Sequence, residues 1–298
     1  MNPSSRIPVS KAWNPAKRND RFMSASKRTV EKSRRGHTPE DPIDWKLPDS
    51  FSESDVRKTF EGVLLCLENM GRRRWSAWEK HLVEYGDWSR DGAILGVTYA
   101  REIVRRRWPE FEPVLIRNSS PLAEYLEWGG FAVGSGPLES LILGSNNHKI
   151  EDRADAAYLY AAIVLKSRWE DGEGVILKAA SVADDAICAS KVAEAYRKRF
   201  FPRQPWAALN AQIRGGRCTP AFVVEYSCIT GKNCHDDANQ GLLKADHNAD
   251  GFTEVLWDYA DGALRDKLPD ELHSVMLLKS FERTDDPFVK AYVETYCV

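Results

Sequence analysis

The sequence predicts an all-α protein in which short helical hairpins form a solenoid-like array, with an extended basic N-terminal arm and an irregular cysteine-containing insert. Three observations lead to this fold class. A short basic–aromatic–acidic signature recurs along the chain, the apolar residues around it follow helical spacing, and the first 50 residues differ in composition from the rest. The 298 residues can build a substantial core, and a hydrophobic content of 43% is typical of a globular protein.

The N-terminal arm, residues 1–50, holds a concentration of basic charge. Its Pro residues interrupt any helix and aliphatic residues are few, so we expect it to be disordered unless a partner orders it. Residues 1–37 contain two acidic and ten basic side chains, a net charge of +8. The ten candidate binding residues of the arm are Arg6, Lys11, Lys17, Arg18, Arg21, Lys27, Arg28, Lys32, Arg34 and Arg35. The other 261 residues hold 32 basic and 42 acidic side chains, so the net charge of −2 conceals a body of −10.

Helical repeats are expected over residues 51–214. The segment 72–83 aligns with 105–116 at an offset of 33 residues, and a third copy lies 61 residues beyond the second. Each copy has a Trp after a basic turn and a Glu four residues later. The pairs are Trp75 and Glu79, Trp108 and Glu112, and Trp169 and Glu173. Residues 134–143 are the candidate for a further copy, with Glu139 in phase.

One unit of the repeat is interpreted as a helical hairpin. A first helix of the Tyr-Ala-x-x-Ile-Val type ends in a basic turn, where cations suit the C-terminal end of the helix dipole. An aromatic residue fills the corner, and Pro109 marks the start of a second helix whose Val114 and Leu115 face the core. A hairpin this small cannot bury its own apolar face, so neighbouring hairpins must stack.

The C-terminal third departs from the regular pattern before returning to it. Residues 215–250 are expected to form the irregular insert, and residues 251–298 a C-terminal helical repeat or cap. Within the cap, Asp286 as N-cap and Pro287 at the first helical position predict a final helix that extends to Tyr296.

These short signatures resemble tandem helical repeats of ~31 residues in uncharacterised proteins of large tailed phages. The repeats have the form Tyr-Ala…Arg-Trp-Pro-Glu-x-Glu or Leu-Pro-x-x-Leu-His-x-x-Met, and the second form matches the segment from Leu268 to Met276. The resemblance covers roughly residues 70–214 and 255–296. It implies a helical-repeat architecture and a phage-type context, and it implies no activity.

The repeated Glu and Trp residues are expected to be structural. Equivalent positions in a stacked array lie about one repeat apart, so Glu79, Glu112 and Glu173 should not converge as an acid–base pair. The Trp residues are expected to pack between helices. The sequence contains neither a Gly-rich phosphate loop nor a Gly-x-Ser-x-Gly nucleophile motif. We therefore expect a protein without enzymatic activity and without a cofactor.

A calcium-like loop is the first of two weak metal-ligand patterns. Its candidate ligands, at loop positions 1, 3, 5 and 9, are Asp246, Asn248, Asp250 and Glu254. Trp257 stands where a bidentate Glu would complete the site. An ordinary turn followed by a helix from Thr253 explains the same residues without a metal and is the favoured interpretation.

A zinc-like cluster is the second pattern. It comprises Cys218, Cys228, Cys234 and His235, with His247 further along the chain. Tetrahedral zinc sites use close ligand pairs two to four residues apart, whereas these Cys gaps are nine and five residues. Buried or free thiols are therefore favoured, with zinc as the minor alternative.

The opposite net charges of the arm and the body suggest how the chain binds its partners. We expect a non-catalytic, phage-type structural or assembly protein that binds other protein copies through its basic arm and helical-repeat surface, because arm and body attract each other. The alternative is a nucleic-acid-associated protein whose arm, with Trp13 and Phe22 between its cations, neutralises phosphates. A solvated tail without a function is the third interpretation.

The expected location is the host-cell cytoplasm, or the virion if the protein is phage-encoded. The longest apolar runs are too short to span a bilayer, so no membrane partner is expected. The N-terminus lacks the apolar stretch of a secretory signal. Six cysteines in 298 residues are too few for a disulfide scaffold.

Overall fold

A computed structural model of the chain describes residues 74, 76–129, 131, 136–144, 147–282 and 285–297. The chain divides into two compact units, Met1–Arg73 and Arg74–Val298, and the described residues belong to the second. The predicted arm, its ten basic residues and residues 51–73 of the expected helical repeats lie outside the described residues.

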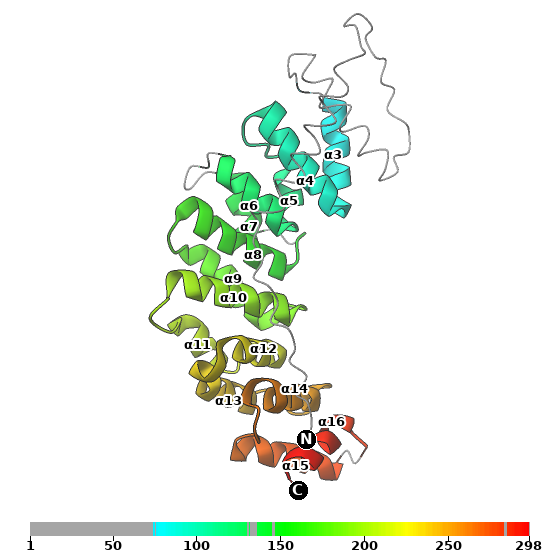
Figure 1. The fold of residues 1–298 in the computed structure, drawn as a ribbon, viewed down its shortest axis with the longest axis vertical. Coiled ribbons are helices and arrows are strands. Elements are labelled where there is room, and N and C mark those ends of the chain that lie inside the picture. Colours follow the sequence, from blue (N-terminus) through cyan, green and yellow to red (C-terminus); the bar gives the residue numbers. More distant parts are fainter. Residues whose placement is uncertain are drawn as a thin grey trace, which may run out of the picture. The chain divides into compact units, whose positions relative to one another are not determined.

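The described residues are all-α, as the sequence predicts. They form fourteen α-helices and contain no strand (Figure 1). The helices are α3 (Ser76–Trp88), α4 (Arg90–Tyr99), α5 (Glu112–Ile116), α6 (Ser119–Trp128), α7 (Pro137–Gly144), α8 (Ile150–Leu159), α9 (Glu170–Val182), α10 (Ala186–Phe200), α11 (Ala207–Arg214), α12 (Pro220–Thr230), α13 (His235–Leu243), α14 (Phe252–Asp258), α15 (Asp270–Glu282) and α16 (Pro287–Tyr296). None of these described helices has the length and the apolar run that a bilayer span requires.

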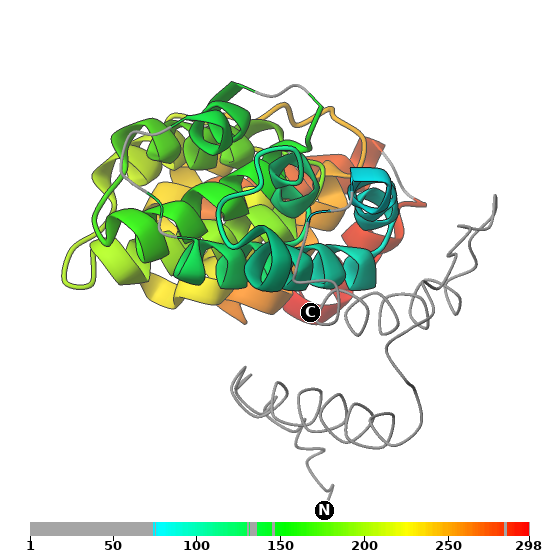
Figure 2. The same cartoon turned by 90° about the horizontal axis from the view of Figure 1, so that it is seen from above.

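The helices alternate between two rows in chain order. The even row consists of α4, α6, α8, α10, α12, α14 and α16, each in contact with the next (Figures 1 and 2). In the odd row, contacts join α3, α5, α7 and α9, and a second series joins α11, α13 and α15. Gln212 of α11 links the two series, because its side-chain amide donates to the carbonyl of Leu177 in α9 at 2.8 Å. We call each odd helix and the even helix after it a hairpin, and contacts join the two helices in α3–α4, α5–α6, α7–α8, α9–α10 and α15–α16. The predicted unit instead begins with the even helix.

Three even helices end in the same unusual way. α4, α8 and α14 widen into π-helical turns over Ala100–Val104, Tyr160–Leu165 and Tyr259–Leu264. The residue after each turn is left-handed, with φ of 54° at Arg105, 53° at Lys166 and 55° at Arg265, and these are the positive-φ residues other than Gly in the described part of the chain. The basic turn that the sequence predicts at these helix ends is therefore also a point of backbone strain, since L-residues avoid this conformation.

The core lies between the two rows and closes tightly around aromatic residues. Trp108, Val114 and Leu115 are at most 3% exposed, which confirms that they face the core. A Cβ atom added at Gly96 would lie 1.9 Å from the Phe111 ring, so α4 can approach this ring only because residue 96 has no side chain.

Two expectations about helix boundaries differ from the structure. Pro109 does not begin the second helix, because Pro109, Glu110 and Phe111 form a turn and α5 starts at Glu112. The expected irregular insert, residues 215–250, is instead largely helical, since it contains α12, a 3₁₀ turn and α13.

The segment 215–250 continues the alternation of the rows. α12 contacts α10 and α14 in the even row, and α13 contacts α11 and α15 in the odd row. Its buried Phe222, Val223 and Tyr226 supply an apolar helix face, although the Arg-Trp signature is missing. The predicted C-terminal helix is confirmed: α16 begins at Pro287, and the Asp286 carboxylate accepts hydrogen bonds from the backbone N–H groups of Phe288 and Val289 at 2.9 and 3.2 Å.

Candidate functional site

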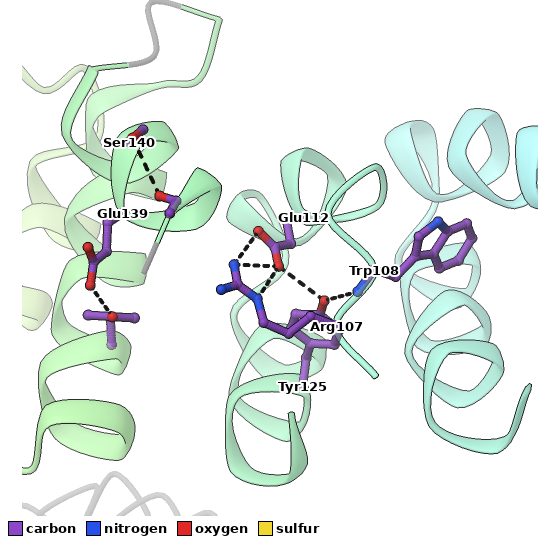
Figure 3. A network of polar contacts seen from close by, with 8 residues as sticks. Arg107, Trp108, Glu112, Tyr125, Glu139 and Ser140 are labelled. Atoms are coloured by element: carbon purple, nitrogen blue, oxygen red, sulfur yellow. Dashed lines mark hydrogen bonds and ion pairs between the residues drawn. The ribbon is translucent and has the colours of Figure 1, made fainter. Parts of the chain in front are cut away.

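The repeated basic–aromatic–acidic signature builds a buried polar cluster, seen most completely around Glu112 in α5 (Figure 3). Arg107 donates two parallel hydrogen bonds to the Glu112 carboxylate, Nε to Oε1 and Nη2 to Oε2, each at 2.9 Å. Tyr125 in α6 donates its hydroxyl proton to Glu112 Oε1 at 3.2 Å and accepts the backbone N–H of Trp108 at 2.6 Å. The cluster thus ties the turn before α5 to both helices of one hairpin.

The burial and pairing of the groups in this cluster are typical of a structural role. Glu112 is fully buried, and burial raises the pKa of its carboxyl while the Arg107 guanidinium opposes that rise. Burial and the neighbouring Glu112 charge raise the pKa of the Tyr125 hydroxyl, so Tyr125 stays a neutral donor. A bidentate Arg–carboxylate pair with a satisfied hydroxyl is a strong and directional link between segments.

The same cluster occurs in two other hairpins. Arg168 donates to the Glu173 carboxylate at 2.7 and 2.9 Å, Tyr196 donates to Glu173 at 3.0 Å, and the Trp169 N–H donates to the Tyr196 hydroxyl at 3.0 Å. Arg74 donates to Glu79 with two bonds of 2.7 Å, and the Tyr99 hydroxyl donates to Glu79 at 3.1 Å. The three carboxylates lie in separate clusters, each with its own Arg, and this confirms that they do not converge.

The sequence analysis uses the Tyr of the Tyr-Ala signature only as a mark of the repeat, and it missed the hydrogen bonds of this Tyr and its recurrence in every even helix. Every even helix, or the π-helical turn that continues it, carries one Tyr that is less than 2% exposed. We call this set the tyrosine ladder: Tyr99, Tyr125, Tyr160, Tyr196, Tyr226, Tyr259 and Tyr292. The signal was present in the sequence as seven tyrosines spaced 26 to 36 residues apart.

Three further ladder tyrosines also bind a side chain of the preceding odd helix. Tyr160 donates to Glu139 of α7, so Glu139, labelled in Figure 3, has the role of the repeated Glu, in agreement with its phase in the sequence. Tyr259 donates to Asn239 of α13 at 2.8 Å. Tyr292 accepts the Leu268 N–H at 3.2 Å, and its hydroxyl lies 2.7 Å from His273 Nδ1. Thus His273 in α15 takes the place that Glu112 has in α5.

The tyrosine rings also join one hairpin to the next. The Trp108 indole points away from Glu112 toward the preceding helices (Figure 3), and its ring centroid lies 5.5 Å from that of Tyr99. The corresponding distance is 4.9 Å for Tyr160 and Trp169, and 5.1 Å for Tyr196 and Trp206. The prediction that Trp108 packs between helices is confirmed. Each of these tyrosines therefore uses its hydroxyl within a hairpin and its ring between hairpins.

The calcium-like loop is organised by hydrogen bonds and a lysine. The Asp246 carboxylate accepts the Asn248 backbone N–H at 2.9 Å, which is the ordinary turn contact. The buried Lys279 ammonium donates to Asn248 Oδ1 at 2.9 Å and to Glu282 at 2.9 Å. Asp250 and Glu254 are exposed. A positive charge already binds the Asn248 oxygen, which favours the turn interpretation over a calcium ion at this oxygen.

The cysteine cluster is dispersed over helical segments. Cys218 and Cys234 are buried, whereas Cys228 is exposed. The Cys234 thiol lies 2.8 Å from the Thr230 hydroxyl, and the His235 ring packs edge-on against Tyr259. Burial raises the pKa of Cys218 to about 12, so this thiol stays protonated. Over the part of the chain that the structure describes, no three His, Cys, Asp or Glu side chains are placed to hold a metal ion.

A depression beside α16 contains several carboxylates, and they have structural partners. It is lined by Gly251, Thr253, Glu282, Asp285, Asp286, Pro287 and Phe288. Asp286 caps α16 and also accepts the Thr253 hydroxyl at 2.8 Å, while Glu282 binds Lys279. The Thr253–Asp286 contact joins the first turn of α14 to the start of α16.

Comparison with known proteins adds no relative: no family model matches the chain, and the searches of curated proteins and of solved structures found no match.

Proposed function

We propose that this chain is a non-catalytic structural or assembly protein, of the phage type that its repeats resemble. In this proposal its hairpins form one solenoid-like array, and it binds other copies through the basic arm and the helical-repeat surface. The observation that carries the proposal is the tyrosine ladder. The polar residues that recur in the sequence form hydrogen bonds that join one helix to another, as Glu112 and Tyr125 and their copies do.

The ladder supports an array because it works between neighbours only. The hydroxyls of Tyr99, Tyr125, Tyr160 and Tyr196 each link the two helices of a hairpin. The rings of Tyr99, Tyr160 and Tyr196 contact the Trp of the following segment. Repeat proteins of this kind are stabilised by nearest-neighbour interfaces and present an extended outer surface for partners. The contacts along the even row, from α4 to α16, agree with such an array.

The arm supplies the proposed attachment between copies. Residues 1–37 carry +8 and the rest of the chain carries −10, so an arm and the body of another copy attract each other. The attraction is electrostatic and should weaken as salt screens it.

Light scattering of the full-length protein tests this proposal. The test variant replaces the ten basic arm residues by Gln, which keeps the length of the arm. The control is an arm with its residues 1–37 scrambled, which keeps the charge. We expect self-association of the native and scrambled chains at low salt, and its loss in the Gln variant. An assembly state that is the same in all three chains would contradict the proposal.

Nucleic-acid binding is the second candidate, because the same ten cations can neutralise phosphates. Titration of the native chain and the Gln variant with duplex DNA of mixed sequence separates the two functions. Arm-dependent affinity with a log–log salt slope of about −0.9 per phosphate contact, without self-association, would favour the nucleic-acid function.

A further inference from the structure

Two apolar side chains stand out on the surface of α15. Phe281 is 82% exposed and Leu278 is 63% exposed, the highest values among the large apolar residues that the structure describes as exposed. They lie three residues apart in one helix and thus on the same face.

Comparison with α9 shows what normally covers part of this face. Glu173 in α9 and His273 in α15 both bind a ladder tyrosine. Four and eight residues later, α9 has Leu177 and Ser181, which both accept hydrogen bonds from Gln212 of the next odd helix, α11. The same two positions in α15 are Leu277 and Phe281. Phe281 therefore occupies a position that faces the following odd helix in α9.

In the described part of the chain, no odd helix follows α15. Its neighbours are α13, α14 and α16, and the helices of Figure 1 end with this pair. The face that carries Phe281 is open in the described structure, as the exposure of Phe281 shows.

Acidic side chains outnumber basic ones in the same region. Residues 251–298 hold ten acidic and five basic side chains, a net charge of −5, which is half of the −10 of the body in 48 residues. Asp270, Glu271 and Glu282 of α15 are exposed, while its one lysine, Lys279, is buried. The helix that carries the open apolar face thus also exposes acidic side chains, which we call its acidic surrounding.

We infer that the Leu278–Phe281 face of α15 is the docking site for the basic arm of a second copy. This inference rests on the proposed function and names its contact surface. The arm complements the face in both respects: it carries +8, and it places Trp13 and Phe22 among its cations. Arm cations pair with the acidic surrounding, and an arm aromatic covers Phe281.

The test combines peptide binding with self-association. A fluorescent peptide of residues 1–37 is titrated into the full-length Gln variant, in which the arm does not compete. The site variant adds Leu278→Lys and Phe281→Ser, because Lys178 and Ser181 stand at the corresponding positions of α9. We expect the peptide Kd to rise about tenfold or more, since two apolar contacts are lost. The control is Val182→Ser, which removes an apolar side chain that is 55% exposed on α9 and should leave Kd unchanged.

The outcomes separate the site from the function. If L278K/F281S in the native background abolishes self-association as arm neutralisation does, the inference is supported. If arm neutralisation abolishes self-association and L278K/F281S does not, the proposed function survives and the α15 site is overturned. An unchanged peptide Kd with lost self-association would mean that α15 packs on another body instead of an arm, and binding without self-association would mean that the arm binds its own copy. Both of these results contradict the inference.

Discussion

At the scale of single residues, the buried tyrosine is the most informative position. Tyr125 satisfies a backbone N–H and a buried carboxylate with one hydroxyl group, and no other side chain of similar size does both. Tyr196 and Tyr292 likewise bind a backbone N–H and a side chain through one hydroxyl group, which a Phe could not do.

We predict that Tyr125→Phe lowers the free energy of unfolding by about 1–3 kcal/mol, because it leaves the Trp108 N–H and one Glu112 oxygen short of a partner. Urea unfolding monitored by circular dichroism measures the change. The matched control is Tyr158→Phe in α8, a half-buried tyrosine outside the ladder, which should change the value by less than about 0.5 kcal/mol. Equal effects of the two variants would show that the ladder hydroxyl does not stabilise the fold.

Thiol reactivity distinguishes buried cysteines from ligands. Burial raises the pKa of Cys218 to about 12 and that of Cys188 to about 11, so the thiolate fraction at pH 8 is smaller than for an ordinary cysteine. We expect iodoacetamide at pH 8 to modify the exposed Cys297 first and Cys218 only after unfolding, as followed by peptide mass spectrometry. Labelling of Cys218 that becomes faster on adding a chelator would instead indicate bound zinc.

At the scale of helices, the π-helical turn and the left-handed residue after it define how an even helix ends. Arg105, Lys166 and Arg265 each follow a ladder Tyr by six residues. A long basic side chain at a position suited to glycine retains favourable charge at the helix C-terminus at the cost of backbone strain.

We predict opposite effects for two lysine-to-glycine changes. Lys166→Gly should raise the free energy of unfolding by about 1 kcal/mol, because glycine adopts φ of 53° without a steric penalty. Lys178→Gly, at an exposed site within α9, should lower it by about 1 kcal/mol. Thermal and urea unfolding of the two variants give the comparison, and a loss of stability in both would refute the account of strain at Lys166.

The sequence predicted correctly those features that depend on residues close to one another in the chain. The Asp286 cap, the in-phase Glu139 and the core-facing Val114 all depend on residues within a few positions of one another. It missed the ladder because each acceptor lies 13 to 23 residues before its Tyr, and this interval varies with loop length. It also took residues 215–250 for an irregular insert, because the Arg-Trp signature is absent there although Tyr226 remains.

At the scale of the whole molecule, acidic charge and an exposed apolar face occur together in residues 251–298. Residues 251–298 carry −5 of the body charge of −10, and α15 in the same region leaves Phe281 82% exposed. An arm of +8 that reaches this region in another copy would link copies without any catalytic chemistry.

Photo-crosslinking from Phe22 tests this account most directly. The full chain carries benzoylphenylalanine in place of Phe22 and is mixed with an equal amount of isotope-labelled native chain at low salt. Mass spectrometry then identifies the crosslinked peptides and the copy from which they come. We predict crosslinks to labelled peptides from residues 270–297, which should disappear with L278K/F281S in the labelled partner. Crosslinks confined to the same copy, or directed to other parts of the labelled chain, would contradict the account.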